Sequence, residues 1–241
     1  MTYLIIGGTG GIGSALARRL RAGGHGVHLI GRNAGKLAEL ADEIGASASL
    51  GDVTDGPGLA AAIAEAGGTL SGLAYCVGSI TLKPLSRLTE ADFLADFQLN
   101  ALGAALAVQA AAPALRASET PPASVVLFSS VAVAQGFASH ASISMAKGAV
   151  EGLTRALGAE LAPKVRVNCI APSLTRTPLA RDLTASSEMA DAIARLHALQ
   201  RLGEADDAAA LAAFLLSPDA GWMTGQIIGV DGGRSTLRTK G

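Results

Sequence analysis

The sequence is poor in aromatic residues, in charge and in cysteine. Only 3% of its 241 residues are aromatic and 16% are charged, and the net charge is -1. A chain without a basic excess has no electrostatic attraction to nucleic acid or to an anionic membrane. We therefore expect a small-molecule partner, no nucleic acid and no membrane.

The two cysteines, Cys76 and Cys169, lie in apolar runs that are typical of buried strands. They are interpreted as buried thiols in a reducing compartment rather than as a disulfide. No group of His, Cys and Asp has the spacing of metal ligands, so no structural metal is expected. The first residues lack the basic segment and cleavage site of a secretory signal, and we expect a cytoplasmic protein.

One segment, 97–115, carries no charge over 19 residues, close to the length that spans a bilayer. It contains Gln98, Asn100, Gln109 and Pro113, and it lacks flanking belts of aromatic and basic residues. This segment is interpreted as a buried helix or a helix at a subunit interface.

Short aliphatic runs alternate with longer alanine-rich patterns along the chain. Strands are predicted at 3–6, 26–30, 46–50, 70–77, 124–129, 166–170 and 226–230, and helices at 12–22, 34–44, 58–66, 90–116, 143–161 and 206–216. Because parallel strands need long crossovers, this alternation predicts an α/β fold. We expect residues 1–241 to form one Rossmann-like domain, a doubly wound parallel sheet of seven strands with helices on both faces, in three layers.

Residues 171–203 interrupt this alternation. The segment is long and rich in Ser, Thr and charged residues, and its helical pattern is weak. Such a segment is typical of a lid over a pocket, and we expect it to cover the substrate.

A glycine-rich turn follows the first predicted strand and opens the first predicted helix. Glycines permit a tight turn and a close approach of the backbone, and the first amides of a helix attract a diphosphate. The alternative is a glycine turn that binds no ligand. The residues assigned to the diphosphate are Gly7, Thr9, Gly10, Gly11, Ile12 and Gly13.

The residues after the second and third strands also concern binding of the dinucleotide. An acid at the end of the second strand selects NAD(H), but here Gly31 is followed by Arg32, which can pair with a 2′-phosphate. We therefore expect NADP(H) rather than NAD(H), the alternative being a solvated arginine. Asp52 and Val53 are assigned to the adenine, unless Asp52 only caps a turn.

Several motifs occur together in one order, and with them the chain resembles the short-chain dehydrogenase/reductase family from about Tyr3 to Gly233. They are GGTGGIG at 7–13, DVT at 52–54, NALG at 100–103, SS at 129–130, KGAVEGLTRALGAELAPKVRVNCIAPSLTRTP at 147–178 and RLGEADDAAALAAFLLSPDAGWMTGQIIGVDGG at 201–233.

The resemblance implies roles for particular residues. Ser130 would hydrogen-bond the substrate carbonyl, Lys147 would hold the nicotinamide ribose and supply positive charge, and Asn100 would anchor a water in a proton relay. The remaining cofactor contacts that it implies are Val77, Gly78, Pro172 and Thr177.

The chain departs from the family at its general acid. The family has a tyrosine four residues before the lysine, and this chain has Ile143 there. The motif after the fourth strand reads YCVG in place of NNAG, and Ser173 replaces a usual glycine. Tyr3 and Tyr75 lie in other strands and cannot replace the acid, whose loss reduces a rate by about 10²- to 10⁴-fold.

Three sources could replace that acid. His140, Ile143 and Lys147 share one helix face if the helix extends back to His140, which would then donate the proton. His140 could instead make only a local hydrogen bond or a subunit contact. A water held by Ser130 and Asn100 is the second source, and the third is solvent, for a substrate that is a protonated imine or a conjugated C=C.

We therefore expect an enzyme, an NADP(H)-dependent oxidoreductase that acts by hydride transfer on a small apolar carbonyl, alcohol, C=N or C=C substrate. The alternative is a protein that binds NADP(H) as a sensor or as a subunit partner. The helices near 97–115 and 143–161 resemble a family interface and predict a homotetramer or homodimer. The apolar lid residues are Leu174, Leu179, Leu183 and Met189.

Overall fold

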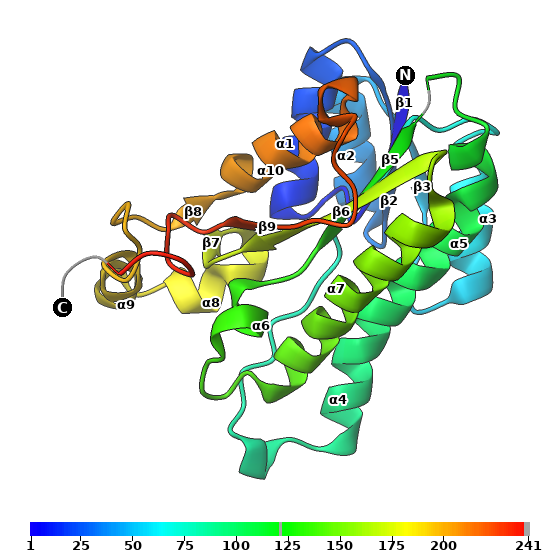
Figure 1. Cartoon of the computed structure of the whole chain (residues 1–241). Helices are drawn as coiled ribbons and strands as arrows, with labels where there is room; N and C mark the ends of the chain where they lie inside the picture. Colours follow the sequence, from blue (N-terminus) through cyan, green and yellow to red (C-terminus); the bar gives the residue numbers. More distant parts are fainter. Residues whose placement is uncertain (121, 239–241) are drawn as a thin grey trace.

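The apolar runs form one parallel sheet in the computed structural model, which describes residues 1–120 and 122–238. Its strand order is β3-β2-β1-β4-β5-β6-β9, and each neighbouring pair is parallel, as predicted (Figure 1). The strands are β1 (Thr2–Ile6), β2 (Gly26–Gly31), β3 (Ser47–Leu50), β4 (Gly72–Tyr75), β5 (Ala123–Phe128), β6 (Val165–Pro172) and β9 (Ile227–Val230).

Helices cover both faces of the sheet and bury two separate apolar cores. One core contains α1 (Gly11–Ala22), α2 (Ala34–Ile44) and α10 (Ala205–Leu216), and the other contains α3 (Gly56–Ala64), α5 (Gly103–Arg116) and α7 (Ala141–Leu161). Alternate residues of β1 enter opposite cores, Tyr3 and Ile5 on one face and Leu4 and Ile6 on the other. A strand buried on both faces has to be apolar throughout, which explains the unbroken aliphatic runs.

The predicted helix 90–116 consists of three consecutive parts. α4 (Glu90–Phe97) leads into a π-helical segment (Gln98–Leu102), and α5 continues from it. Residues of α5 that face the sheet, including Ala107 and Leu115, are fully buried, so most of the uncharged segment belongs to a buried helix. In the described part of the chain, no helix is long and apolar enough to cross a bilayer.

Short elements complete the chain. Around residues 171–204 they include β7 (Thr175–Arg176), which pairs with β8 (Gly203–Glu204), and between these α8 (Arg181–Thr184) and α9 (Ser187–Ala194). These elements lie beside the carboxyl ends of the strands (Figure 1). The others are η1 (Leu85–Arg87), α6 (Val131–Gln135), η3 (Pro178–Ala180) and η4 (Pro218–Ala220).

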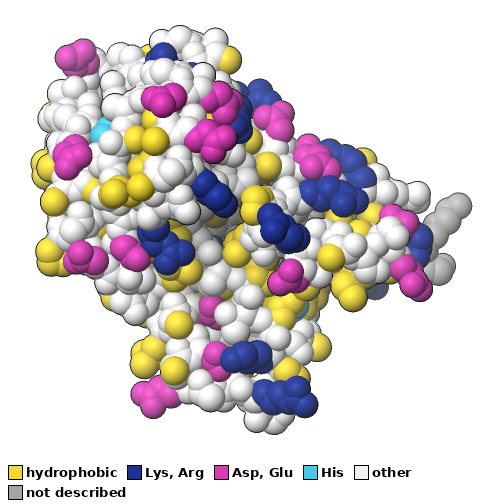
Figure 2. Space-filling view, turned by 180° about the vertical axis from the view of Figure 1, so that it is seen from behind, with side chains coloured by type: hydrophobic (Ala, Val, Ile, Leu, Met, Phe, Trp, Pro, Cys, Tyr) yellow, Lys and Arg dark blue, Asp and Glu magenta, His cyan; other side chains and the backbone are white. Residues whose placement is uncertain are grey.

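Charged side chains of both signs lie on one face of the molecule. Basic and acidic side chains are interspersed on the face that Figure 2 shows. Trp222, the single tryptophan of the sequence, follows η4 and is completely exposed.

Candidate active site

The candidate site lies at the carboxyl end of β1, where the chain continues to β2 on one side and β4 lies on the other. β1 lies between β2 and β4, so the loops after β1 and β4 leave a crevice at the carboxyl edge of the sheet. The glycine turn after Ile6 forms one side of the crevice, and Cys76, Val77 and Gly78 form the other.

At Gly7 the glycine turn has no room for a side chain. Gly7 has a φ of +81°, and a β-carbon on it would lie 2.9 Å from Cγ2 of Val77. Gly10 precedes α1, and no side chain caps this helix end. The first amides of α1 are therefore available to an anion.

Most residues assigned to the cofactor line this crevice, and four do not. Gly13 packs against the backbone of Gly7. Asp52 accepts from the Thr54 amide at 2.9 Å and from the Thr54 hydroxyl at 2.7 Å, and these bonds lower the pKa of its carboxyl. Lys147 and Pro172 lie in the adjoining pocket. Those that line the crevice are Gly7, Thr9, Gly10, Gly11, Ile12, Arg32, Val53, Val77, Gly78 and Thr177.

The far end of the crevice carries two cations. Arg32 is exposed after β2, with Nη1 3.8 Å from Oδ2 of Asp52, a separation at which a surface pair contributes little. The Asn33 side chain caps α2 by accepting from the amide of Lys36 at 3.0 Å, and both residues line the crevice. Lys36 was missed by the sequence analysis, although its place four residues after Arg32 puts it in the first turn of the predicted helix.

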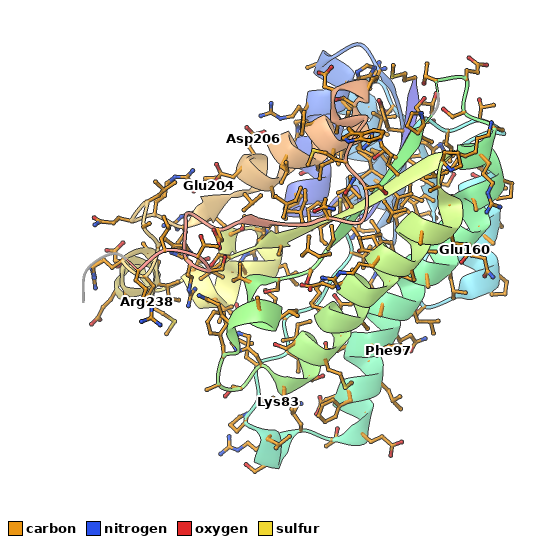
Figure 3. The ribbon with its side chains drawn as sticks, in the orientation of Figure 1. Lys83, Phe97, Glu160, Glu204, Asp206 and Arg238 are labelled. Carbon is orange, nitrogen blue, oxygen red and sulfur yellow. The ribbon has the colours of Figure 1, made fainter. Side chains whose placement is uncertain are left out.

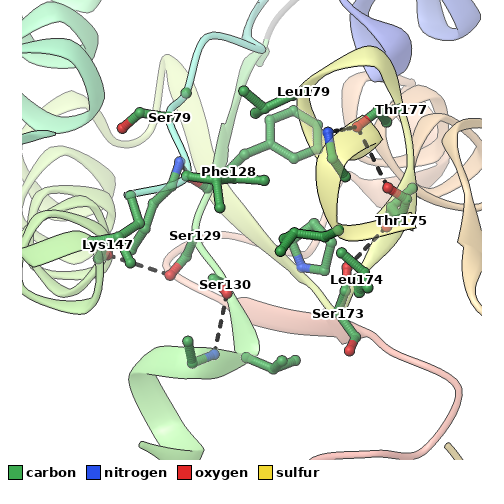
Figure 4. Close-up of a pocket in the computed structure, with 18 of the residues that line it drawn as sticks. Ser79, Phe128, Ser129, Ser130, Lys147, Ser173, Leu174, Thr175, Thr177 and Leu179 are labelled. Atoms are coloured by element: carbon green, nitrogen blue, oxygen red, sulfur yellow. Dashed lines mark hydrogen bonds between the residues drawn. The ribbon is translucent and has the colours of Figure 1, made fainter. Parts of the chain in front are cut away.

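A second pocket opens beside this crevice, and Val77, Gly78 and Thr177 border both. Ser130 and Lys147 line this pocket (Figure 4), as does Ile143. Of the lid residues, Leu174, Leu179 and Leu183 line the pocket, whereas Met189 is half exposed and lies outside it.

The two neighbouring serines have different surroundings. Ser129 is buried and donates to Oε1 of Glu151 at 2.8 Å, with a second contact to the Lys147 carbonyl at 3.3 Å. Ser130 caps α6 by accepting from the Ala132 amide at 3.2 Å. Since an accepting hydroxyl keeps its proton, Ser130 can still donate to a bound carbonyl.

Lys147 is buried beneath the pocket. Its Nζ donates to the Phe128 carbonyl at 2.9 Å, and the residue is 7% exposed. Burial lowers the pKa of this ammonium to about 8, because a charged group loses its hydration there. A cation whose pKa lies so near neutrality can both stabilise a developing anion and lose a proton.

Asn100 lies in the π-helical segment, a distortion that is frequent at functional sites. Its Nδ2 donates at 2.8 Å to Ser79 Oγ and to the Asp96 carbonyl. Its buried Oδ1 receives no hydrogen bond from any described residue. This oxygen and Lys147 Nζ both lie 3.2 Å from the place of a β-carbon on Gly78, so they border one small space.

Ile143 occupies the pocket wall one turn of α7 before Lys147, and it is 6% exposed. The helix begins at Ala141, so His140 precedes it, but His140 still lines the pocket. His140 Nδ1 lies 2.7 Å from the Ala138 carbonyl, the local hydrogen bond of the alternative interpretation. Tyr75 is buried in the sheet and donates to the Leu99 carbonyl at 2.6 Å.

A buried carboxylate lies behind Asn100, and the sequence analysis missed it. Asp96 is 2% exposed and accepts from the hydroxyls of Ser79 at 2.6 Å, Thr81 at 2.9 Å and Ser142 at 2.6 Å. Asp96 and Asn100 stand four residues apart, and this helical spacing was the available signal. The cluster connects α4, the loop after β4 and the start of α7.

Both cysteines are free, and burial raises the pKa of each thiol to about 12. Within residues 1–120 and 122–238, no three His, Cys, Asp or Glu side chains gather in a way that could hold a metal ion.

Comparison with known proteins gives concordant matches. A family model described as enoyl-(acyl carrier protein) reductase matches residues 7–235. The chain is 34% identical to a tropinone reductase homologue of Arabidopsis thaliana, over 96% of this chain and 91% of that protein. It is 30% identical to human dehydrogenase/reductase SDR family member 4, over 95% of this chain and 86% of that protein.

Solved structures agree with the sequence matches. A short-chain type dehydrogenase/reductase from Mycobacterium ulcerans superimposes with a TM-score of 0.92 and 33% identity, covering 98% of this chain and 90% of that one. A short-chain dehydrogenase/reductase from Brucella melitensis gives a TM-score of 0.91 and 30% identity, covering 98% and 97%.

Proposed function

Because the chain belongs to the short-chain dehydrogenase/reductase family, we propose that it is an NADP(H)-dependent oxidoreductase acting on a small carbonyl or alcohol. The observation that carries this proposal is the meeting of two cavities at Val77 and Gly78. One cavity contains the glycine turn, and the other contains Ser130 and Lys147. Residues 171–203 cover the substrate in this proposal.

The residues present fit the cofactor along its whole length. The uncapped start of α1 suits the diphosphate, and Arg32 with Lys36 suits a 2′-phosphate. Lys147 and Thr177 would hold the nicotinamide end. A nicotinamide bound there supplies or accepts a hydride.

The chain's own residues supply hydrogen bonds and a proton. Ser130 donates to the substrate oxygen, and the Lys147 ammonium stabilises the negative charge that develops on it. Asn100 Oδ1, which has no protein donor in the described chain, accepts from a water next to Lys147 Nζ. That water protonates the substrate alkoxide, and Lys147 returns a proton to the water. His140, at the pocket wall, is the competing donor, and solvent is the donor for an imine or C=C substrate.

A second candidate function follows from Ile143. A protein that keeps the cofactor site but lacks the acid could bind NADP(H) as a sensor or as a subunit partner.

Calorimetry followed by a turnover assay tests both candidates. We expect NADPH to bind more tightly than NADH and to be consumed when ketones, enones or cyclic imines are added. NADPH binding without consumption across the panel favours the second candidate. Failure to bind either cofactor contradicts both.

We also propose that the protein assembles as a homotetramer or homodimer through α4, α5 and α7. It resides in the cytoplasm in this proposal, where its free thiols stay reduced. Exposed apolar side chains on these helices support the assembly: Leu94, Phe97, Leu102 and Met145 (Phe97 is labelled in Figure 3).

A further inference from the structure

An arginine from the C-terminal segment forms part of the wall of the substrate pocket. Arg234 is half-buried there, and its Cζ lies 4.6 Å from the centre of the Phe137 ring. Its Nη1 donates to Ser173 Oγ at 3.4 Å. The Phe137 ring covers one face of the guanidinium. Because the N–H groups lie in the guanidinium plane, those that do not bond Ser173 point outward along that plane.

In the described part of the chain, no carboxylate forms an ion pair with this guanidinium. Asp231, three residues earlier, is committed to its own turn. Its Oδ1 accepts from the Gly233 amide at 2.9 Å, and its Oδ2 accepts from the amide of Ser235 at 2.9 Å and from the hydroxyl of that residue. Burial is unfavourable for a cation and lowers the pKa of Arg234, while the charge of Asp231 acts in the opposite direction without offsetting it.

Ser173 holds the arginine in place. His197 Nδ1 lies 2.9 Å from the Ile193 carbonyl, which can only accept, so this nitrogen carries the proton. In a neutral ring Nε2 is then an acceptor, and the Ser173 hydroxyl donates a hydrogen bond to it at 2.8 Å. The Ser173 oxygen is left to accept from Arg234. Ser173 stands where the family usually has glycine, which has no side chain to accept from an arginine.

The described residues that line the rest of the pocket wall include no acidic side chain. The titratable side chains among its described lining residues are Cys76, His140, Lys147 and Arg234, and no Asp or Glu is among them. Most of the other lining side chains are apolar, among them Ile80, Leu82, Leu174, Leu179, Leu183 and Ile193.

We propose that the substrate is an oxo acid or hydroxy acid whose carboxylate binds Arg234 while its carbonyl or hydroxyl group lies at Ser130 and Lys147. A planar guanidinium with free N–H groups matches a carboxylate with two parallel hydrogen bonds. The apolar wall then contacts the carbon chain between the two groups. This inference rests on the proposed function and specifies its substrate class.

A matched substrate panel tests the inference. NADPH oxidation is measured with oxo acids of increasing separation between ketone and carboxylate, and with their methyl esters. We expect at least one acid to exceed its ester in kcat/KM by 10- to 100-fold, the range for a charge-assisted hydrogen bond. Arg234→Met should raise KM for that acid by a similar factor and leave its ester unchanged.

Arg195→Met is the control, because Arg195 is exposed just after α9 and outside the pocket wall. Arg234→Lys keeps the charge and loses the planar pair of N–H donors. Its KM for the acid should lie between those of the wild type and Arg234→Met. Esters that react as well as acids, or an equal loss for both in Arg234→Met, would overturn the inference.

A binding measurement separates this inference from the proposed function. Saturated carboxylic acids and their carboxamides are titrated into NADPH-loaded protein, which requires no turnover. If the acid binds to the wild type and not to Arg234→Met, the anion site is supported even when no compound oxidises NADPH. Equal affinity for acid and amide rejects the anion site even when ketones are reduced.

Discussion

At position 143 the pocket wall carries a side chain that cannot donate or accept a proton. Ile143 is buried in the pocket wall, one helical turn from Lys147. Ser130, Lys147 and Asn100 retain groups that can donate, carry charge and accept a water. Position 143 is therefore a place where the missing acid can be added back.

Ile143→Tyr should increase the rate of ketone reduction about 100-fold, because a positioned acid contributes at least this factor. The measurement is kcat for NADPH oxidation with the best ketone of the panel. Ile143→Phe is the control, since it has the same ring without the hydroxyl. Equal rates in the two variants would show that proton supply does not limit the reaction.

Lys147 predicts a dependence of stability on pH. Its pKa is about 8 in the folded protein, against an ordinary value of 10.5. Between these pH values the unfolded chain binds more protons, so the free energy of unfolding rises with pH, by roughly 3 kcal/mol from this group. Below pH 8 both states are protonated and the full penalty of burying the charge is present.

Comparison with Lys147→Met isolates this contribution from that of the tyrosines and cysteines. Urea unfolding between pH 7 and 10.5 should show wild type gaining roughly 3 kcal/mol relative to the variant. A difference that stays constant over this range would mean that Lys147 is not desolvated in the folded protein.

At the scale of elements, the Asp96 cluster connects α4 to the start of α7. Asp96→Asn should lower the free energy of unfolding by about 2 kcal/mol, because an amide N–H would face hydroxyl groups that now donate to a carboxylate. Urea unfolding checks this, with Asp42→Asn on the exposed face of α2 as control. Unchanged stability in both variants would show that the three hydroxyls find other acceptors.

The start of α2 sets the choice of cofactor in the proposed function. Arg32→Ala should raise KM for NADPH by 10- to 100-fold and leave KM for NADH nearly unchanged, because only NADPH carries the 2′-phosphate. Steady-state kinetics with both cofactors check this. Arg116→Ala, at the exposed end of α5, is the control, and equal losses with both cofactors would contradict the assignment.

Elements with one dominant pattern were predictable from the sequence. The central strands β1, β4 and β5 are buried almost throughout, and the predicted ranges of the seven strands coincide with the observed ones to within a few residues. The π-helical segment around Asn100 was not predictable, because it differs from an α-helix only in hydrogen bonding. The elements of residues 171–204 were missed because each is too short to show a period.

At the scale of the molecule, the proposed assembly predicts a concentration-dependent mass. Phe97→Glu should shift the protein toward the monomer, because a carboxylate would replace an apolar side chain, 40% exposed in the single chain, at the proposed interface. Light scattering after gel filtration measures the mass, with Leu50→Glu at the end of β3 as control. A monomeric wild type at micromolar concentration would contradict the assembly.

The candidate site was predictable where it follows a local motif and not where it depends on distant contacts. The glycine turn, Ser130 and Lys147 each stand in a recognisable local sequence. Arg234 meets Phe137 and Ser173 only in the folded chain, and nothing in its own neighbourhood indicates a pocket. The same holds for Asp96, whose hydroxyl donors come from three parts of the chain.

Trp222 has a practical consequence for following this protein by spectroscopy. An indole that is already surrounded by solvent emits at nearly the same wavelength before and after denaturation, so tryptophan fluorescence is a weak reporter of unfolding, and circular dichroism should be used instead. The same indole will change its emission when another surface covers it. A blue shift that grows with protein concentration would therefore locate a subunit contact at this residue without any label.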